Sequence, residues 1–234
     1  MVEKKVAIIQ SSYIPWKGYF DIINSVDEFI IYDNVQYTRR DWRNRNLIKT
    51  PNGLKWLTIP VDVKGKYYQK ICDTAIKDPE WRTKHWKAIK HSYRRAQYFN
   101  RYKEYIERLF LDCNEKYLSD INYRFIKGIN QLLGINTKIT SSANYSLVEG
   151  KTERLVNICK EAGANQYISG PSAKDYLNIG LFEKEDIEVQ WMEYSGYPEY
   201  TQLYPPFAHG VSIIDLILNE GPNAPNYMKS FQHN

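Results

Sequence analysis

The segment VAIIQSSYIPWKGYFDIINSVDEFIIYD, residues 6–33, decides the fold. Residues 6–11 form an apolar run that ends in polar residues, which is typical of a strand buried in a parallel sheet. Phe20, Ile23 and Val26 follow at helical spacing, and residues 28–33 form a second buried run. The segment therefore predicts a compact β-α-β unit close to the start of the chain.

The same alternation continues outward from this unit. Strand character returns at 137–145, 166–170 and 188–194, with helical patterns over 149–162 and 212–221 and over most of 79–133. Residues 56–61 follow the turn signal Pro51-Asn52-Gly53, so they form either another strand of the sheet or the return arm of a hairpin. We predict an α/β fold: a doubly wound, mainly parallel, Rossmann-like sheet of about five strands. Residues 1–234 would form a single domain, with a helical lobe at about 79–133 inserted over the binding edge.

The composition and charge of the chain indicate what kind of ligand it binds and in which cellular compartment it lies. The net charge of +5 is modest and spread along the chain, which favours a small acidic ligand over nucleic acid, although residues 84–103 are strongly basic. Cys72, Cys113 and Cys159 are far apart and lack metal-ligand spacing, so neither a disulfide framework nor a zinc site is predicted. The apolar run near Met1 is too short for a signal peptide or a membrane span. We therefore expect a cytoplasmic protein without a membrane span.

The ligand is expected at one edge of the sheet. Right-handed crossovers place the loops that follow parallel strands together, and ligands bind along that edge. Three loops should meet there: residues 10–18, 33–46 and 170–176.

Cations and backbone amides in these loops suit an anionic ligand. Lys17 and Gly18 fall at the first turn of a helix, where an ammonium and free N–H groups can face a phosphate. Arg43 and Arg45 share one face if the chain is extended, and two guanidiniums suit a diphosphate or a carboxylate. The alternatives are a glycine required only by turn geometry and a solvated ion-pair network.

A general base is expected near the C-terminus. His209 lies in a loop before a helix capped by Ser212, with Asp215 close in sequence, whereas His85 and His91 fall inside helices and His233 lies at the chain end. His209 is therefore the candidate catalytic base and Asp215 its orienting partner. A capping or hydrogen-bonding histidine is the alternative.

The candidate site residues gather around these loops. Those assigned to substrate binding are Gln10, Tyr13, Lys17, Gly18, Asp33, Gln36, Arg43, Asn44, Arg45, Ser169, Gly170, Ser172, Lys174, Tyr176, Tyr200 and Gln202. No metal ligand set and no cofactor are predicted. The chain lacks GxGxxG, GxxxxGK[ST], GxSxG and HExxH, which disfavours dehydrogenases, P-loop kinases, serine hydrolases and zinc proteases.

Three blocks of the sequence resemble the WbqC-like family: QSSYIPWKGYFDIINSVDEFIIYDNVQYTRRDWRNRN, YISGPSAKDYL and YTQLYPPFAHGVSIIDLILNEG. The resemblance covers nearly the whole chain and implies a bacterial protein encoded with O-antigen, lipopolysaccharide and related surface-polysaccharide genes. A weaker likeness, in PWKGY and ISGPSAK, is to the HIGH-signature nucleotidyltransferase superfamily. Both signature histidines of that superfamily are absent, with Lys17 and Tyr19 nearby instead.

Together with the context that this resemblance implies, the candidate cations and base favour a transferase that acts on a nucleotide-linked sugar in surface-polysaccharide synthesis. The transferred group would be an acyl or aminoacyl group carried to an amino sugar, with its donor or a carrier protein as a second partner. The alternatives are nucleotidyl transfer, or a non-catalytic binding or scaffold protein. Arbitrary RNA bound without turnover would favour the last of these.

Overall fold

The fold is built on a five-stranded parallel sheet. The computed structural model describes residues 3–232, so His233 lies outside the described residues. The strands are β1 (Lys5–Ile9), β2 (Glu28–Ile31), β5 (Lys138–Ser141), β6 (Gln166–Ser169) and β7 (Glu188–Trp191), arranged in the order β5-β2-β1-β6-β7. Every neighbouring pair is parallel, which confirms the predicted α/β, Rossmann-like class.

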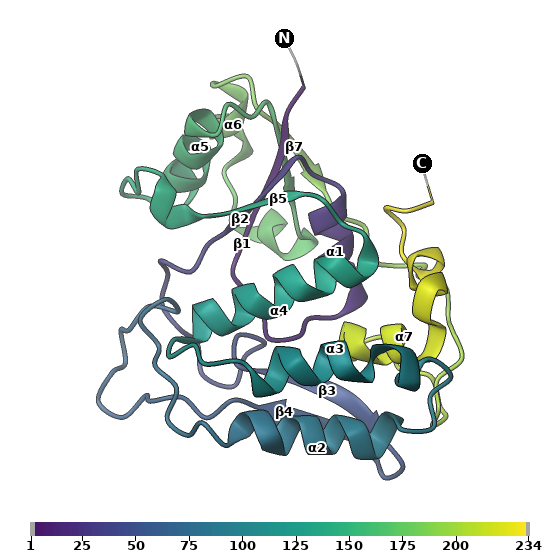
Figure 1. Ribbon diagram of the computed structural model, residues 1–234. Helices are drawn as coiled ribbons and strands as arrows, with labels where there is room; N and C mark the ends of the chain where they lie inside the picture. Colours follow the sequence, from purple (N-terminus) through teal and green to yellow (C-terminus); the bar gives the residue numbers. More distant parts are fainter. Residues whose placement is uncertain (1–2, 233–234) are drawn as a thin grey trace.

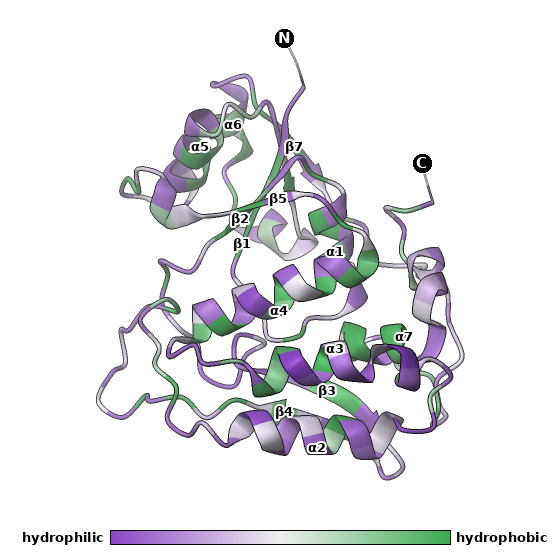
Figure 2. Cartoon of the chain, in the orientation of Figure 1, coloured by the Kyte–Doolittle hydropathy of each residue, from purple (hydrophilic) through white to green (hydrophobic). Residues whose placement is uncertain are grey.

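Helices cover both faces of this sheet (Figure 1). Side chains of α1 (Lys17–Asn24) and α4 (Leu118–Leu133) pack with Ala7 and Phe29 in the main hydrophobic cluster. On the other face, α5 (Lys151–Glu161) and α6 (Ile179–Glu183) pack with Ile8 and Ile30 in a second cluster. The central strands are predominantly hydrophobic because they are buried on both sides (Figure 2).

A hairpin and three further helices extend the main hydrophobic cluster. Strands β3 (Arg45–Thr50) and β4 (Gly53–Thr58) pair antiparallel, so the segment around residues 56–61 is the return arm of a hairpin rather than part of the sheet. The turn ends at Gly53, whose φ of 96° favours glycine. Helices α2 (Trp81–Tyr93) and α7 (Ile213–Glu220) contact β3, and α3 (Phe99–Leu111) packs against both of these helices. The short 3-10 helices are η1 (Ser142–Asn144), η2 (Pro171–Asp175) and η3 (Gly221–Tyr227).

Helix α4 fixes the loops that leave β1 and β2. The Asn122 side-chain amide donates to Ser11 Oγ at 2.8 Å and to the backbone oxygen of Arg43 at 2.9 Å. Asp33 accepts from the Ser11 amide at 2.8 Å and from Ser119 Oγ. Both loops are therefore held against α4 by buried polar contacts.

None of the described helices is long and apolar enough to cross a membrane.

Candidate functional site

A large cleft lies at the point where the order of strands reverses. From β1 the chain runs to β2 and β5 on one side, then crosses to β6 and β7 on the other, so the reversal falls between β1 and β6. In open α/β sheets, ligands bind at the carboxyl ends of the strands at this position. A cleft of about 830 Å³ occupies it and is contacted by Gln10 after β1 and by Ser169 and Gly170 at the end of β6.

The lining of this cleft is positively charged. Its cations are Arg43, Lys70, Lys151 and Arg154, and no aspartate or glutamate among residues 3–232 lines it. Within residues 3–232, Lys70, Lys151 and Arg154 form no salt bridge, so their charges are not neutralised by the protein. We call this the basic cleft. It is lined by Ile8, Ile9, Gln10, Trp16, Tyr19, Tyr32, Asn34, Val35, Gln36, Arg43, Tyr68, Lys70, Gly150, Lys151, Arg154, Leu155, Tyr167, Ser169, Gly170, Ser172, Ala173, Tyr176 and Tyr194.

The N-terminal end of α5 contributes two of these cations. Gly150 precedes the helix with a φ of 89°, a left-handed backbone conformation that favours glycine. Arg154 is held by hydrogen bonds from Nε to the Val148 oxygen (2.8 Å) and from Nη1 to the Tyr32 hydroxyl (3.3 Å). The side chains of Lys151 and Arg154 and the first amides of α5 are therefore positioned together at the cleft.

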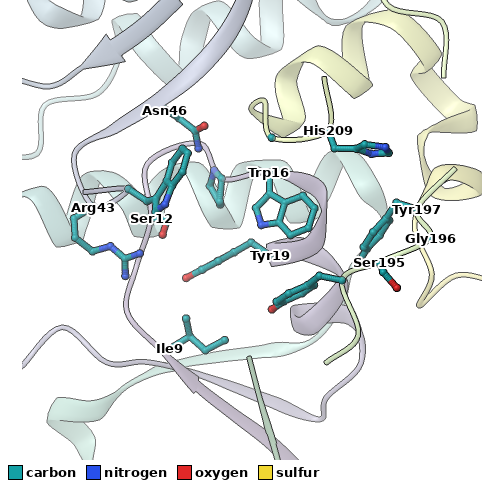
Figure 3. Close-up of a pocket in the computed structure, with 14 residues that line it drawn as sticks. Ile9, Ser12, Trp16, Tyr19, Arg43, Asn46, Ser195, Gly196, Tyr197 and His209 are labelled. Carbon is teal, nitrogen blue, oxygen red and sulfur yellow. The ribbon is translucent and has the colours of Figure 1, made fainter. Parts of the chain in front are cut away.

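A second cleft adjoins the first. It has a volume of about 550 Å³, and both clefts share Ile9, Trp16, Tyr19, Arg43 and Tyr194. We call it the aromatic cleft because Trp42 and Tyr197 complete its walls. Figure 3 shows Arg43 at one end and His209 at the other, with Trp16 and Tyr19 between them. The other lining residues are Ser12, Pro15, Asn46, Ser195, Gly196 and Gly210.

Arg43 stands where the two clefts join. Its Nη1 donates to Gln10 Oε1 at 2.8 Å, and its side chain is 11% exposed. Its Nε lies 3.8 Å from Asp41 Oδ2 and makes no hydrogen bond within the described part of the chain. The guanidinium is therefore oriented by Gln10 and keeps donor capacity for a ligand.

The clefts bring together only some of the residues named from the sequence. Those that line the basic cleft are Gln10, Gln36, Arg43, Ser169, Gly170, Ser172 and Tyr176, and His209 lines the aromatic cleft. The loops expected to meet at the sheet edge therefore do contribute to one cleft.

Lys17 and Gly18 do not line either cleft. The Lys17 ammonium donates to the Pro198 oxygen at 2.8 Å and lies over the rings of Tyr197 and Tyr200. Burial lowers the pKa of Lys17 to about 8. A Cβ atom on Gly18 would lie 2.3 Å from the Trp16 ring, so the glycine lets this indole rest on α1. The Lys17 side chain points toward residues 197–200, which pack over the start of α1.

Five further candidates have structural contacts instead. The Tyr13 hydroxyl is buried beside His85 Nδ1 at 2.8 Å, and Asp33 accepts from Ser11 and Ser119 as described above. The Asn44 amide donates to the Ile59 oxygen at 2.8 Å. The other two make cation–π contacts: Arg45 lies 4.1 Å from the Trp56 ring centre, and the Lys174 ammonium lies 5.6 Å from that of Trp191.

The structure does not pair Asp215 with His209. Asp215 is fully buried and accepts from the hydroxyls of Tyr93 (2.7 Å) and Tyr200 (2.8 Å). Burial raises the pKa of Asp215, and the two tyrosine hydrogen bonds oppose this shift. Gln202 donates to Tyr200 and exchanges two hydrogen bonds with the backbone of Ala208. These residues anchor the loop that carries His209, and His209 itself is exposed and packs edge-on against Phe207.

Sequence reasoning missed three of the four cations of the basic cleft. Lys151 and Arg154 open the helix that follows β5, and β5 ends at the same sheet edge as β1 and β6. The rule that pointed to the other loops therefore also points to this helix. Lys70 lies outside regular secondary structure, where no pattern in the sequence indicates its position.

Within residues 3–232, no group of three or more His, Cys, Asp or Glu side chains could hold a metal ion.

Comparison with known proteins agrees with the resemblance seen in the sequence. The model of the WbqC-like protein family matches residues 10–227. The uncharacterized protein Rv1507c of Mycobacterium tuberculosis is 48% identical over 226 residues, which are 97% of this chain and 98% of the relative. No solved structure matches the chain significantly. The chain therefore belongs to the WbqC-like protein family.

Proposed function

We propose that this protein is a transferase that acts on a nucleotide-linked sugar in the synthesis of bacterial surface polysaccharide such as O-antigen. One observation carries the proposal: the strand-reversal cleft is lined by four cations and by no carboxylate. A diphosphate carries the complementary charge, and Arg43 and Arg154 can each offer it a planar pair of donors. The membership of the WbqC-like family supports the polysaccharide context.

The tyrosines of the basic cleft suit the nucleoside. Tyr68 and Tyr176 are 82% and 64% exposed at the cleft, so their ring faces are accessible to a base or a ribose. Aromatic side chains combine a large apolar face with a polar tip, which fits a nucleoside better than a simple inorganic phosphate. The proposed ligand is thus a nucleoside diphosphate unit rather than phosphate alone.

The transfer step is assigned to the aromatic cleft. An amine or hydroxyl of the sugar would attack the carbonyl carbon of an acyl or aminoacyl donor, and the bond from that carbon to the donor's leaving group would break. His209 would accept the proton lost by the attacking group. Its exposed ring lines the aromatic cleft, which Arg43 joins to the basic cleft.

Binding measurements on charge variants test the proposal. Calorimetric titration with uridine, thymidine, guanosine, cytidine and adenosine diphosphates and their diphospho-sugars should identify at least one ligand. The double variant Lys151→Ala/Arg154→Ala should bind it about 10- to 100-fold more weakly, since charged hydrogen bonds are lost. Lys87→Ala/Lys90→Ala removes the same charge from exposed positions of α2 and should leave the affinity unchanged.

Two results would contradict the proposal. If no nucleotide or diphospho-sugar binds, or if both double variants lose affinity equally, the basic cleft is not a diphosphate site. Release of pyrophosphate from ATP or CTP would identify nucleotidyl transfer instead of acyl transfer.

A further inference from the structure

The aromatic cleft differs in chemistry from the basic cleft beside it. Rings of Trp16, Tyr19, Trp42, Tyr194 and Tyr197 form its walls. In the part of the chain that the structure describes, Arg43, at the junction, is the only lysine, arginine, aspartate or glutamate that lines it. Its volume of about 550 Å³ falls within the usual range of small-molecule sites, roughly 300–1,000 Å³. The cleft therefore suits an uncharged group attached to something anionic.

The aromatic walls are fixed before any ligand enters. Trp16 rests on Gly18 and meets the rings of Tyr194 and Tyr197 edge-on, at centroid distances of 5.3 and 5.5 Å. Trp42, which also lines the cleft, packs against Trp56 with the ring centroids 5.3 Å apart. Side chains held in this way lose little conformational freedom when a ligand binds.

Arg45 supports Trp42 indirectly, through its contact with Trp56. Its guanidinium lies 4.1 Å from the Trp56 ring centre, on the ring that also contacts Trp42. Of these three residues only Trp42 lines the cleft, and Arg45 and Trp56 lie outside it. Arg45 is therefore a positioning residue for the aromatic cleft rather than a phosphate ligand.

The loop under the cleft is strained. Ile14 has a φ of 37°, which is costly for a β-branched residue, and its side chain is fully buried. The Asn46 side-chain amide holds this conformation by donating to the backbone oxygens of Tyr13 (3.1 Å) and Ile14 (3.0 Å). Strain of this kind occurs mainly at ligand sites, and here it sets the path of the chain into Pro15 and Trp16, which line the cleft.

We propose that the aromatic cleft binds the uncharged sugar ring of the nucleotide-linked sugar. The inference rests on the proposed function and adds the place of the sugar. A pyranose ring has apolar C–H faces that pack on aromatic rings, and hydroxyl edges that the side chains of Ser12 and Ser195 can meet. Arg43 then contacts the phosphate next to the sugar, and His209 lies at the sugar end of the ligand.

The test compares a nucleoside diphosphate with the diphospho-sugar of the same base. Trp42 is 43% exposed, so Trp42→Ala can be made without opening the core. We expect this variant to bind the diphospho-sugar about tenfold more weakly and the nucleoside diphosphate within about twofold of wild type. Trp42→Phe, which retains a ring, should recover most of the lost affinity. Tyr123→Ala removes a similarly exposed ring from α4, outside both clefts, and should change neither affinity.

The outcomes separate this inference from the proposed function. If Trp42→Ala weakens both ligands equally, or neither, the sugar does not lie in the aromatic cleft, while diphosphate binding in the basic cleft stands. If Lys151→Ala/Arg154→Ala leaves both affinities unchanged, or if wild type binds neither ligand, the proposed function fails and this inference fails with it.

Discussion

Arg43 and Arg45 are two positions apart, and the structure gives them different surroundings. Arg43 lines both clefts, whereas Arg45 stacks on Trp56 outside them. The sequence predicted a shared face for the two guanidiniums because it assumed an extended chain through both residues. Strand β3 begins only at Arg45, so the expected alternation does not extend back to Arg43.

Replacing each arginine by lysine tests this difference. Arg43→Lys keeps the charge but loses the planar pair of donors, so we expect about tenfold weaker binding of a nucleoside diphosphate. Arg45→Lys should leave that affinity unchanged, because Arg45 does not line the basic cleft. Titration calorimetry on both variants measures the effect, and equal losses would place both residues on the ligand.

His209 is expected to act in turnover and not in folding. Because its side chain is exposed, His209→Ala should change the free energy of unfolding by no more than about 0.5 kcal/mol. Loss of a general base should lower kcat by about 10²- to 10⁴-fold, with diphosphate affinity retained. Denaturant unfolding and turnover on one preparation measure both quantities. A stability loss with unchanged turnover would show that His209 only packs on Phe207.

At the scale of elements, the positions of the strands could be predicted better than the elements that they pair with or pack against. The central strands of the parallel sheet are buried on both faces, so β1 and β2 appear in the sequence as continuous apolar runs. For residues 56–61 the sequence allowed either a further strand of the sheet or the return arm of a hairpin. A turn signal indicates where the chain reverses, but it does not indicate which elements pack against the two arms. In the structure, the inner strand β3 packs against α2 and α7, and β4 remains largely exposed.

A buried glutamate links β2 to β5 and to the residue before β1. Glu28 on β2 accepts hydrogen bonds from Lys4 (2.8 Å), Lys138 (3.2 Å), Thr140 (2.8 Å) and Tyr145 (2.6 Å). Burial alone would raise the pKa of Glu28, but these hydrogen bonds outweigh burial and lower it to about 2. The carboxylate is therefore stabilised in the folded protein relative to the unfolded chain.

Acid should remove this stabilisation. Because the folded-state pKa of about 2 lies below the ordinary value of 4.5, the contribution of Glu28 is fully present above about pH 4.5 and is lost as the pH falls toward 2. Glu28→Gln should lower the free energy of unfolding by on the order of 2 kcal/mol near neutral pH, and by much less near pH 2. Urea unfolding at both pH values measures this. Glu104→Gln, an exposed change on α3, is the control, and an equal loss at both pH values would contradict the ionic origin.

For the whole molecule, a bound nucleotide should raise the melting temperature. A ligand at about 100 times its dissociation constant stabilises the folded state by about 2.7 kcal/mol, which corresponds to a shift of roughly 5–10 °C for a chain of this length. The matching nucleoside without phosphates should produce a much smaller shift. Thermal unfolding at about 0.05 M and about 0.5 M salt should show the shift decreasing, since salt screens the exposed cations of the basic cleft. A shift independent of both phosphate and salt would exclude a charge-based site.

The two clefts are lined by residues that the ribosome adds at different stages of synthesis. Except for Tyr194, every residue that lines the basic cleft lies at or before Tyr176, whereas the aromatic cleft also needs residues 195–197 and 209–210. Backbone bonds from Ser212 to Leu47 and from Ile213 to Pro15 then fasten this late segment to the early loops. In the order of synthesis, nearly all residues of the charged half of the site are therefore made before the residues that close its aromatic half.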